Sequence, residues 1–482
     1  MGASSRRVLV TGGTGVVGKS AVDHLLARGF TVRLLSRNAE RDARQWPQGV
    51  EPYPASITDD AKVCGAGADC EAILHITGIV TEDPPEVTFE KVNVEGTRAL
   101  AREAERCASR YHESKRRAEE AVAAECTSVP SLVLRVGNVF GCGDQVLSLL
   151  LRMVRSLPVV PVVGFGQQPF QPVWADDLGK ALALSVDLEG HDGAVLNLLG
   201  PERTTVHEVL DIFGELTGRK PPRVPVPELV ARLGTALSDK VGLGLPVHAD
   251  EVIMLCEGNA LEPGQSNAMV DVFGVEMTPL REALRALTEA MPEQLPAEGV
   301  GQLERQSYVG RLTSPGVDPE AAMAFFRDHF AELTGEGAMD TEAGRPDAVG
   351  ATLTMELPMR GQVQVRVEQL TPTSLTLVTL AGHPLAGVIR FLASADGEAL
   401  RFEVRSYTRA GSYVDLLAMA GGGKIAQKLT WVRVIKALAD RLGAPLEGDV
   451  EVQTHTLSEG EAAGLEDWLE ELVLARKRKE AA

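Results

Sequence analysis

A glycine-rich turn between an apolar strand and a helix constrains the fold of this chain more than any other feature. The strand is Val8-Leu9-Val10, and the turn with the start of the helix reads Thr11-Gly12-Gly13-Thr14-Gly15-Val16-Val17-Gly18. In a dinucleotide-binding unit the first glycine allows the tight turn, the middle one lets backbone approach a pyrophosphate, and the last lets helix and strand pack closely. Free N–H groups at the helix start would face the phosphates. We therefore predict cofactor binding by Gly12, Thr14, Gly15, Val16, Val17 and Gly18.

Strand-like and helix-like segments continue to alternate after this turn. Gly29 ends the first helix, Thr31 to Leu35 reads as a second strand, and Ala72 to Leu74 and Ser131 to Leu134 read as later strands of the same sheet. This order predicts an α/β fold, a Rossmann domain with a doubly wound parallel sheet. We assign residues 1–290 to it, with a small substrate-side subdomain over about 195–290.

The end of the second strand indicates which dinucleotide binds. An acidic residue there would bind the ribose 2′-OH of NAD, but this chain has Ser36 and Arg37. Because a guanidinium is a planar partner for a 2′-phosphate, NADP is the predicted cofactor and NAD the alternative. Arg37 as an ordinary solvated arginine is the other interpretation.

Further motifs extend the pattern along the first domain. They are His75-Ile76-Thr77-Gly78, Asn93-Val94-Glu95-Gly96-Thr97, Tyr111-His112-Glu113-Ser114-Lys115, Gly137-Asn138-Val139-Phe140-Gly141 and Pro172-Val173-Trp174-Ala175-Asp176-Asp177. With these motifs, residues 7 to about 290 resemble extended or atypical short-chain dehydrogenase/reductases of the NAD-dependent epimerase/dehydratase group. They are similar in particular to relatives of the 39 kDa subunit of respiratory complex I.

The resemblance implies a catalytic pair, Tyr111 and Lys115, and an NAD(P)-dependent oxidoreductase or epimerase/dehydratase-like activity on a small molecule. Lys115 lies one helical turn after Tyr111, so it would share its face, lower the pKa of the phenol and hold the cofactor ribose. Ser56, Thr77 and Gly78 would line the cofactor site.

One departure from the family keeps an alternative open. Only Arg98 to Arg110 separate Thr97 from Tyr111, and this stretch is helix-forming, so the family's fifth strand and catalytic serine have no counterpart there. The alternative is therefore a non-catalytic dinucleotide-binding protein or a carrier of a hydrophobic ligand.

The pattern changes in the C-terminal part. We expect a linker over 291–315, rich in proline and glycine, and a separate α+β domain over 316–482. Val363, Val365 and Val367 alternate with polar residues, as do Leu400, Phe402 and Val404, which predicts antiparallel strands. Ile425, Leu429, Val432, Ile435 and Leu438 recur at helical spacing and should bury one face of a long helix.

This C-terminal part resembles an uncharacterised bacterial family of the helix-grip (START-like, polyketide-cyclase-like) superfamily. The likeness rests on the stretches Leu380 to Gly387, Arg390-Phe391 and Phe402 to Tyr407. It implies an antiparallel sheet around a long helix, with an apolar cavity for a hydrophobic small molecule. The alternative is that the same apolar residues fill the core.

Composition excludes other classes. A formal net charge of −19 argues against nucleic-acid binding. No apolar run approaches the ~20 residues of a membrane span, and no signal peptide is apparent, so we expect a cytoplasmic protein. The histidines lack metal-binding spacing, and we predict no metal site.

Overall fold

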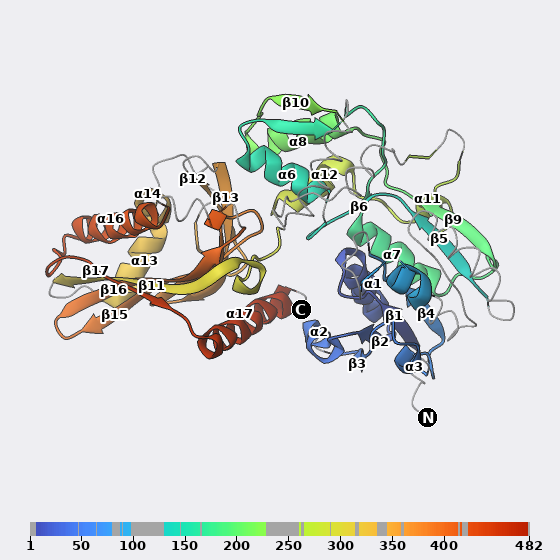
Figure 1. Cartoon of the computed structure of the whole chain (residues 1–482), viewed down its shortest axis with the longest axis horizontal. Helices are drawn as coiled ribbons and strands as arrows, with labels where there is room; N and C mark the ends of the chain where they lie inside the picture. The colour runs from blue at the N-terminus through green and yellow to red at the C-terminus, as the bar shows by residue number, and fades with distance from the viewer. Residues whose placement is uncertain are drawn as a thin grey trace. The chain divides into compact units, whose positions relative to one another are not determined.

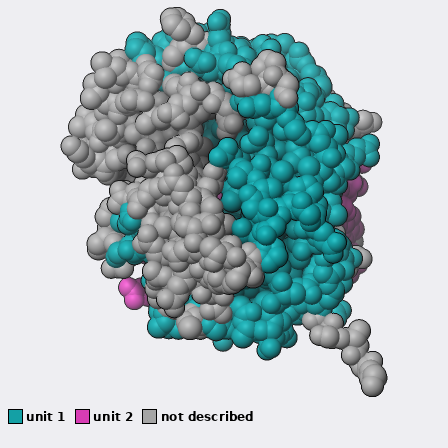
Figure 2. Space-filling view, turned by 90° about the vertical axis from the view of Figure 1, so that its right-hand side faces the viewer, with its two compact units in different colours: residues 1–154, 159–290 teal, residues 155–158, 291–482 magenta. Residues whose placement is uncertain are grey.

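The computed structural model divides the chain into two compact units, residues 1–154 with 159–290 (unit 1) and residues 155–158 with 291–482 (unit 2) (Figure 1). Each unit is described by itself. Figure 2 shows the two units on the molecular surface, and unit 1 makes up most of the described surface on that face. The structure describes residues 6–46, 48–63, 65–79, 87–88, 90–97, 130–144, 146–163, 166–227, 260–261, 265–289, 291–313, 318–334, 345–357, 361–412, 415–416 and 423–480.

The centre of unit 1 is a four-stranded parallel sheet in the order β3-β2-β1-β4. Its strands are β1 (Arg7–Thr11), β2 (Thr31–Ser36), β3 (Val50–Pro54) and β4 (Ala72–His75). Residues 8–10 are fully buried, as expected for a strand covered on both faces. The chain adds β2 and β3 on one side of β1 and then crosses to add β4 on the other. This reversal of strand order defines a Rossmann-like switch point between β1 and β4 and confirms the predicted fold class.

Helix α1 (Val16–Ala27) follows β1 and packs against α7 (Ala175–Ser185). It ends where the sequence predicted, at Gly29, whose φ of 81° is left-handed. The Gly29 and Phe30 N–H groups donate to the carbonyls of Leu26 and Leu25, at 2.9 and 3.1 Å. This glycine closure satisfies the last carbonyls of α1 and turns the chain into β2.

The rest of unit 1 contains three two-stranded pairs, all parallel. They are β5 (Leu132–Val136) with β9 (Ala194–Leu198), β6 (Val139–Phe140) with β8 (Val173–Trp174), and β7 (Val160–Val163) with β10 (Arg223–Val226). The helices are α2 (Ala39–Asp42), η1 (Ala43–Gln45), α3 (Asp60–Val63), η2 (Glu90–Glu95), α6 (Leu147–Ser156), α8 (Val206–Thr217), α11 (Ala268–Asp271) and α12 (Leu280–Glu289). We expected β5 in the main sheet, but among the described residues β5 pairs with β9 and β4 forms the edge of the main sheet.

Unit 2 is built on a seven-stranded antiparallel sheet in the order β12-β13-β14-β15-β16-β11-β17. The strands are β11 (Val300–Thr313), β12 (Thr352–Leu357), β13 (Gly361–Thr371), β14 (Ser374–Thr379), β15 (Leu385–Asp396), β16 (Ala399–Ala410) and β17 (Glu451–Thr456). The helices are η3 (Pro296–Glu298), α13 (Pro319–Asp328), α14 (Phe330–Thr334), α16 (Lys424–Leu442) and α17 (Glu459–Glu480). The predicted antiparallel α+β domain is therefore present.

The two faces of this sheet differ in character because successive side chains point to opposite sides. One face packs with α13, α14 and α16 into the main core, around Phe326, Phe330, Phe391 and Phe402. The other face carries many charged residues and has a small apolar contact with α17, in which Leu469 packs between β14 and β15.

Two expectations for this part were wrong. The predicted linker over 291–315 contains β11, which lies inside the sheet between β16 and β17. Glycine and proline around the strand obscured the buried Tyr308 and Leu312 that fix it in the core. Helix α16 also does not bury the whole predicted stripe, since Ile425 and Leu429 are 67% and 64% exposed. Helix α16 packs on the sheet from about Trp431 onward.

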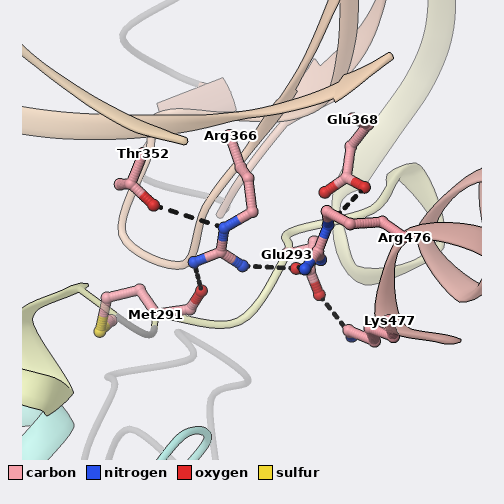
Figure 3. A network of polar contacts seen from close by, with 7 residues as sticks. All are labelled: Met291, Glu293, Thr352, Arg366, Glu368, Arg476 and Lys477. Carbon is pink, nitrogen blue, oxygen red and sulfur yellow. Dashed lines mark hydrogen bonds and ion pairs between the residues drawn. The ribbon is translucent and has the colours of Figure 1, made fainter. Parts of the chain in front are cut away.

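A buried network of charges joins α17 to the segment that enters unit 2 (Figure 3). The Glu293 carboxylate accepts hydrogen bonds from Arg366 at 2.5 Å, from Lys477 at 2.7 Å and from Arg476. Arg476 Nε also donates to Glu368 at 2.8 Å. These paired charges hold the last turns of α17 on the sheet, because leaving any one of them unpaired in the interior is costly.

Candidate dinucleotide site

The turn after β1 has a backbone that only glycine fits. Gly12 has a left-handed φ of 72°, and a Cβ atom on it would lie 2.8 Å from the backbone nitrogen of Thr77. The end of β1 therefore touches the loop after β4 directly. This contact lies at the switch point, where open α/β sheets bind their ligands.

The start of α1 is packed just as closely on this turn. A Cβ atom on Gly18 would lie 1.9 Å from the carbonyl oxygen of Gly12, so the helix and the turn can approach only without that side chain. Gly15 is the N-cap residue of α1, and no side chain caps the helix. Thr14 and Gly15 are exposed, and Val16 and Val17 are partly exposed. The open end of α1 thus offers N–H groups and the positive end of the helix dipole to an anion, which fits a pyrophosphate.

The residues predicted to choose the cofactor lie at the end of β2. The Ser36 hydroxyl donates to Asp42 at 2.5 Å and is therefore occupied within the protein. Arg37 is exposed and has no hydrogen bond or ion pair with any residue that the structure describes. Its guanidinium is therefore available for a phosphate group.

Ser56 lies just after β3, at the same carboxyl edge of the sheet. Its Oγ is 2.8 Å from Thr58 Oγ1 and also accepts a hydrogen bond from the Thr58 N–H. The hydroxyl thus shapes a local turn, which leaves the half-buried Ser56 as a wall of the site more than as a free donor.

The loop after β4, which carries Thr77 and Gly78, is fixed by one buried amide. Asn93 is 1% exposed, its Nδ2 donates to the Ile79 carbonyl at 3.0 Å, and its Oδ1 accepts from the Ile79 N–H at 2.8 Å. These two bonds to the backbone N–H and carbonyl of Ile79 hold this loop in place against Gly12.

A histidine bridge links the same elements from the other side. His75 Nδ1 lies 2.6 Å from Thr11 Oγ1, and its Nε2 lies 2.8 Å from Thr97 Oγ1. Because the Thr97 hydroxyl donates to the Asn93 carbonyl, it accepts from His75 Nε2–H. The imidazole therefore ties the ends of β1 and β4 to the segment 90–97.

The paired aspartates at the start of α7 serve packing. Asp177 is buried and accepts hydrogen bonds from the Thr278 N–H at 2.6 Å and the Thr278 hydroxyl at 3.1 Å. Asp176 accepts from Ser20 at 2.8 Å and lies 3.0 Å from His24, both on α1. These contacts lock α7 on α1 and so support the helix whose first turn faces the cofactor position.

The structure brings most of the predicted cofactor residues to one edge of the sheet. Residues 12 and 14–18 follow β1, Ser36 ends β2 and Arg37 follows it, Ser56 follows β3, and Thr77 and Gly78 follow β4. Tyr111 and Lys115 lie outside the described residues. Sequence reasoning missed the roles of Asn93 and His75, although both stand in motifs that it singled out. The sequence pattern that could have indicated both roles is a single polar residue beside a buried apolar strand or turn.

Metal sites and membrane spans are both missing from the part of the chain that the structure describes. No group of three or more histidine, cysteine, aspartate or glutamate side chains there could hold a metal ion. None of the described helices combines the length and the apolar character of a membrane span.

The first unit matches known proteins. Residues 8–111 match the model of the NAD dependent epimerase/dehydratase family. The chain is 25% identical over 279 residues to the mitochondrial NADH dehydrogenase [ubiquinone] 1 alpha subcomplex subunit 9 of Arabidopsis thaliana, with 52% of this chain and 68% of the relative covered. It is 26% identical over 302 residues to the epimerase family protein SDR39U1 of Mus musculus, with 54% and 93% covered. Among solved structures, MoeE5 in complex with UDP-glucose and NAD is 19% identical, with 59% of this chain and 97% of that chain covered and a TM-score of 0.44.

The N-terminal domain is thus similar to the NAD dependent epimerase/dehydratase family over residues 8–111, and its relatives include a mitochondrial NADH dehydrogenase subunit. This confirms the resemblance predicted for that domain, while the helix-grip resemblance of unit 2 stays a prediction.

Proposed function

We propose that unit 1 binds NADP(H), with NAD(H) as the alternative, and acts as an oxidoreductase or epimerase/dehydratase-like enzyme on a small molecule. The observation that carries the proposal is the glycine cradle at the uncapped start of α1, within a stretch that matches an NAD-dependent family. Two backbone contacts that exclude a Cβ atom, at Gly12 and at Gly18, fit a turn whose own N–H groups approach the phosphates of a ligand.

In this proposal each group of residues contacts a different part of the cofactor. The turn from Gly12 to Gly18 holds the pyrophosphate, and Arg37 pairs with the 2′-phosphate of NADP. Ser56 lies against the adenine end, and Thr77 with Gly78 against the nicotinamide end. The free guanidinium of Arg37 supports NADP, whereas the family description names NAD.

Tyr111 and Lys115 carry the proposed proton transfer. A tyrosine ordinarily titrates near pH ~10, so a phenol needs help to act as a base at neutral pH. An ammonium one helical turn away stabilises the phenolate, and Tyr111 then exchanges a proton with the substrate oxygen. The nicotinamide, when bound, supplies the hydride chemistry. The substrate is a small molecule with an oxidisable hydroxyl or a reducible carbonyl. The substrate panel described next also distinguishes an apolar from a polar substrate.

The test is turnover by the Tyr111→Phe variant. Wild-type protein is incubated with NADPH and a panel of aldehydes, ketones and oxidised sugar nucleotides, and loss of nicotinamide absorbance is followed. We expect a substrate-dependent rate that falls by at least about 100-fold in Tyr111→Phe, since general acid–base catalysis contributes about 10²- to 10⁴-fold. NADPH affinity should stay unchanged in the variant. Equal rates in both proteins would refute the assignment.

One observation favours a second candidate, a non-catalytic dinucleotide-binding protein. In the described part of the main sheet, β4 is an edge strand, and only Arg98 to Arg110 precede Tyr111 after Thr97. The family's fifth strand and its serine thus have no place in the sequence. Tight NADPH binding with no turnover on any carbonyl would support this candidate.

The aromatic core of unit 2, the proposed helix-grip domain, bears on whether this domain carries an apolar ligand. The rings of Phe326, Phe330, Phe391 and Phe402 contact one another with centroid distances from 4.7 to 5.9 Å. They fill the space between α13 and the sheet, which favours a packed core over a carrier of apolar ligands.

A further inference from the structure

The charged face of the sheet in unit 2 contains an unusual pair of arginines. Arg390 on β15 lies directly opposite Arg405 on β16 in the strand register. Like charges in directly opposite positions destabilise a sheet unless something compensates them. Arg405 is compensated, because its Nε and Nη2 donate to the two carboxylate oxygens of Glu403 at 2.6 and 2.9 Å.

Arg390 has no such partner. Its guanidinium lies over the ring of Trp468 on α17, 5.1 Å from the ring centroid, and its buried Nε makes no hydrogen bond. No carboxylate among the described residues pairs with it. Burial and repulsion by Arg405 lower the pKa of Arg390, and the more distant charge of Glu403 does not offset them.

Thr376 on β14 flanks Arg390 from the strand opposite to that of Arg405. It is directly opposite Arg390 in the register of β14 with β15, it is fully buried, and its hydroxyl has no hydrogen-bond partner. Buried hydroxyl groups nearly always bond to something, so an unpartnered one beside an unpaired arginine needs an explanation. Thr376 and Arg390 both offer donors, and Arg405 adds positive charge.

We infer that the sheet face beneath α17 is a binding site for an oxyanion, the carboxylate or phosphate group of a small molecule, held by Arg390 and Thr376. Stacking on Trp468 leaves the N–H edge of the guanidinium free to bind oxygen atoms in its plane. The site is independent of the dinucleotide site in unit 1.

The nearest carboxylates do not oppose an anion strongly. Glu403 is already shared by arginines on its own strand, and Glu368 on β13 is bound to Arg476. In a chain with a formal net charge of −19, this cation-rich face is a selective place for an anion.

The test is calorimetric titration of the full chain with inorganic phosphate and with acetate, at an ionic strength fixed by chloride. We expect saturable binding of at least one anion that weakens about tenfold or more in Arg390→Gln and in Thr376→Val, because each variant loses a bond to a charged group. Arg433→Gln is the matched control, since Arg433 is an exposed arginine on α16, which packs on the other face. It should bind as the wild type does.

The two anions distinguish the sources of the ligand. If phosphate alone binds, the natural ligand carries a phosphate group, and if acetate alone binds, it carries a carboxylate. If both anions bind, the site recognises only the negative charge that they share. Absence of saturable binding of either anion, or wild-type affinity in Thr376→Val, overturns the inference. Thr376→Val keeps the shape of the side chain and removes a group that bonds to nothing, so it should fold with undiminished stability even if Arg390→Gln does not.

Discussion

The contact between α1 and the turn before it gives the sharpest prediction. In Gly18→Ala the new Cβ atom would lie 1.9 Å from the Gly12 carbonyl oxygen, about 1.5 Å short of an ordinary contact of 3.4 Å. The obstacle is backbone, which cannot move aside as a flexible side chain would. Overpacking costs roughly 1–3 kcal/mol, and alanine returns up to about 1 kcal/mol of helix propensity. We therefore expect a net loss of roughly 1–2 kcal/mol in the free energy of unfolding.

The matched variant is Gly15→Ser. A Cβ atom at Gly15 meets the same Gly12 oxygen at 3.4 Å, and serine is a preferred N-cap residue, so unfolding should change by less than about 0.5 kcal/mol. Its side chain would nevertheless occupy the place where a pyrophosphate approaches the backbone. Both variants should thus lose NADPH affinity by at least about tenfold, since a hydrogen bond to a charged group contributes ~1.5–3 kcal/mol. Only Gly18→Ala should also lose stability.

Urea unfolding followed by circular dichroism measures the first quantity, and NADPH fluorescence measures the second. Gly464→Ala on α17 is the control for helix propensity alone, because a Cβ atom there meets nothing within 4 Å, and it should stabilise the protein by up to about 1 kcal/mol. Wild-type stability and affinity in Gly18→Ala would refute the tight packing. Wild-type affinity in Gly15→Ser would refute the phosphate position.

Three further predictions concern buried polar groups. Glu293→Gln should lower the free energy of unfolding by about 3–5 kcal/mol, against less than about 1 kcal/mol for the more exposed ion-pair residue in Glu466→Gln, measured by urea unfolding. The cations around Glu293 outweigh its burial and hold its pKa at about 2, below the ordinary 4.5. The stabilisation by the ionised Glu293 is therefore complete above pH 4.5 and is lost as the pH falls toward 2. Unfolding measured over a series of pH values should show a loss of roughly 3 kcal/mol in the wild type and no such loss in Glu293→Gln. Asn93→Ala should cost about 1–3 kcal/mol and weaken NADPH binding, because the Ile79 N–H and the Ile79 carbonyl both lose their bond to Asn93. Asn93→Asp keeps the bond from the Ile79 N–H and should lose less, and equal losses in the two variants would contradict this role of Asn93.

Much of the first unit could be predicted because local patterns and the fold agree there. The apolar run before Gly12, the glycine spacing and Gly29 each have one physical interpretation, and all point to the same β-α-β unit. The roles of His75 and Asn93 could not be predicted, since each depends on a partner that only the folded chain brings near.

The second unit shows where pattern reasoning fails. Strand β11 was expected to be a linker because glycine and proline lie close to its ends, and pairing with β16 and β17 overrides that local signal. Helical spacing predicted that Ile425 would be buried, but spacing does not say how far along α16 the sheet reaches. Arg390 stood in one of the stretches behind the helix-grip likeness, but the sequence did not indicate an anion site there, because that interpretation depends on the residues opposite Arg390 in the register.

The central claim is that unit 1 binds a dinucleotide and that Arg37 favours NADP. The most direct measurement is a fluorescence titration of the purified full chain with NADPH and NADH, in wild type and in Arg37→Ser. The account predicts saturable binding of NADPH that is tighter than that of NADH, and a preference that falls by at least about tenfold in the variant, since a charge-assisted pair is lost. Absence of binding of either cofactor to the wild type would contradict the dinucleotide site, and an unchanged preference in Arg37→Ser would contradict the role of Arg37.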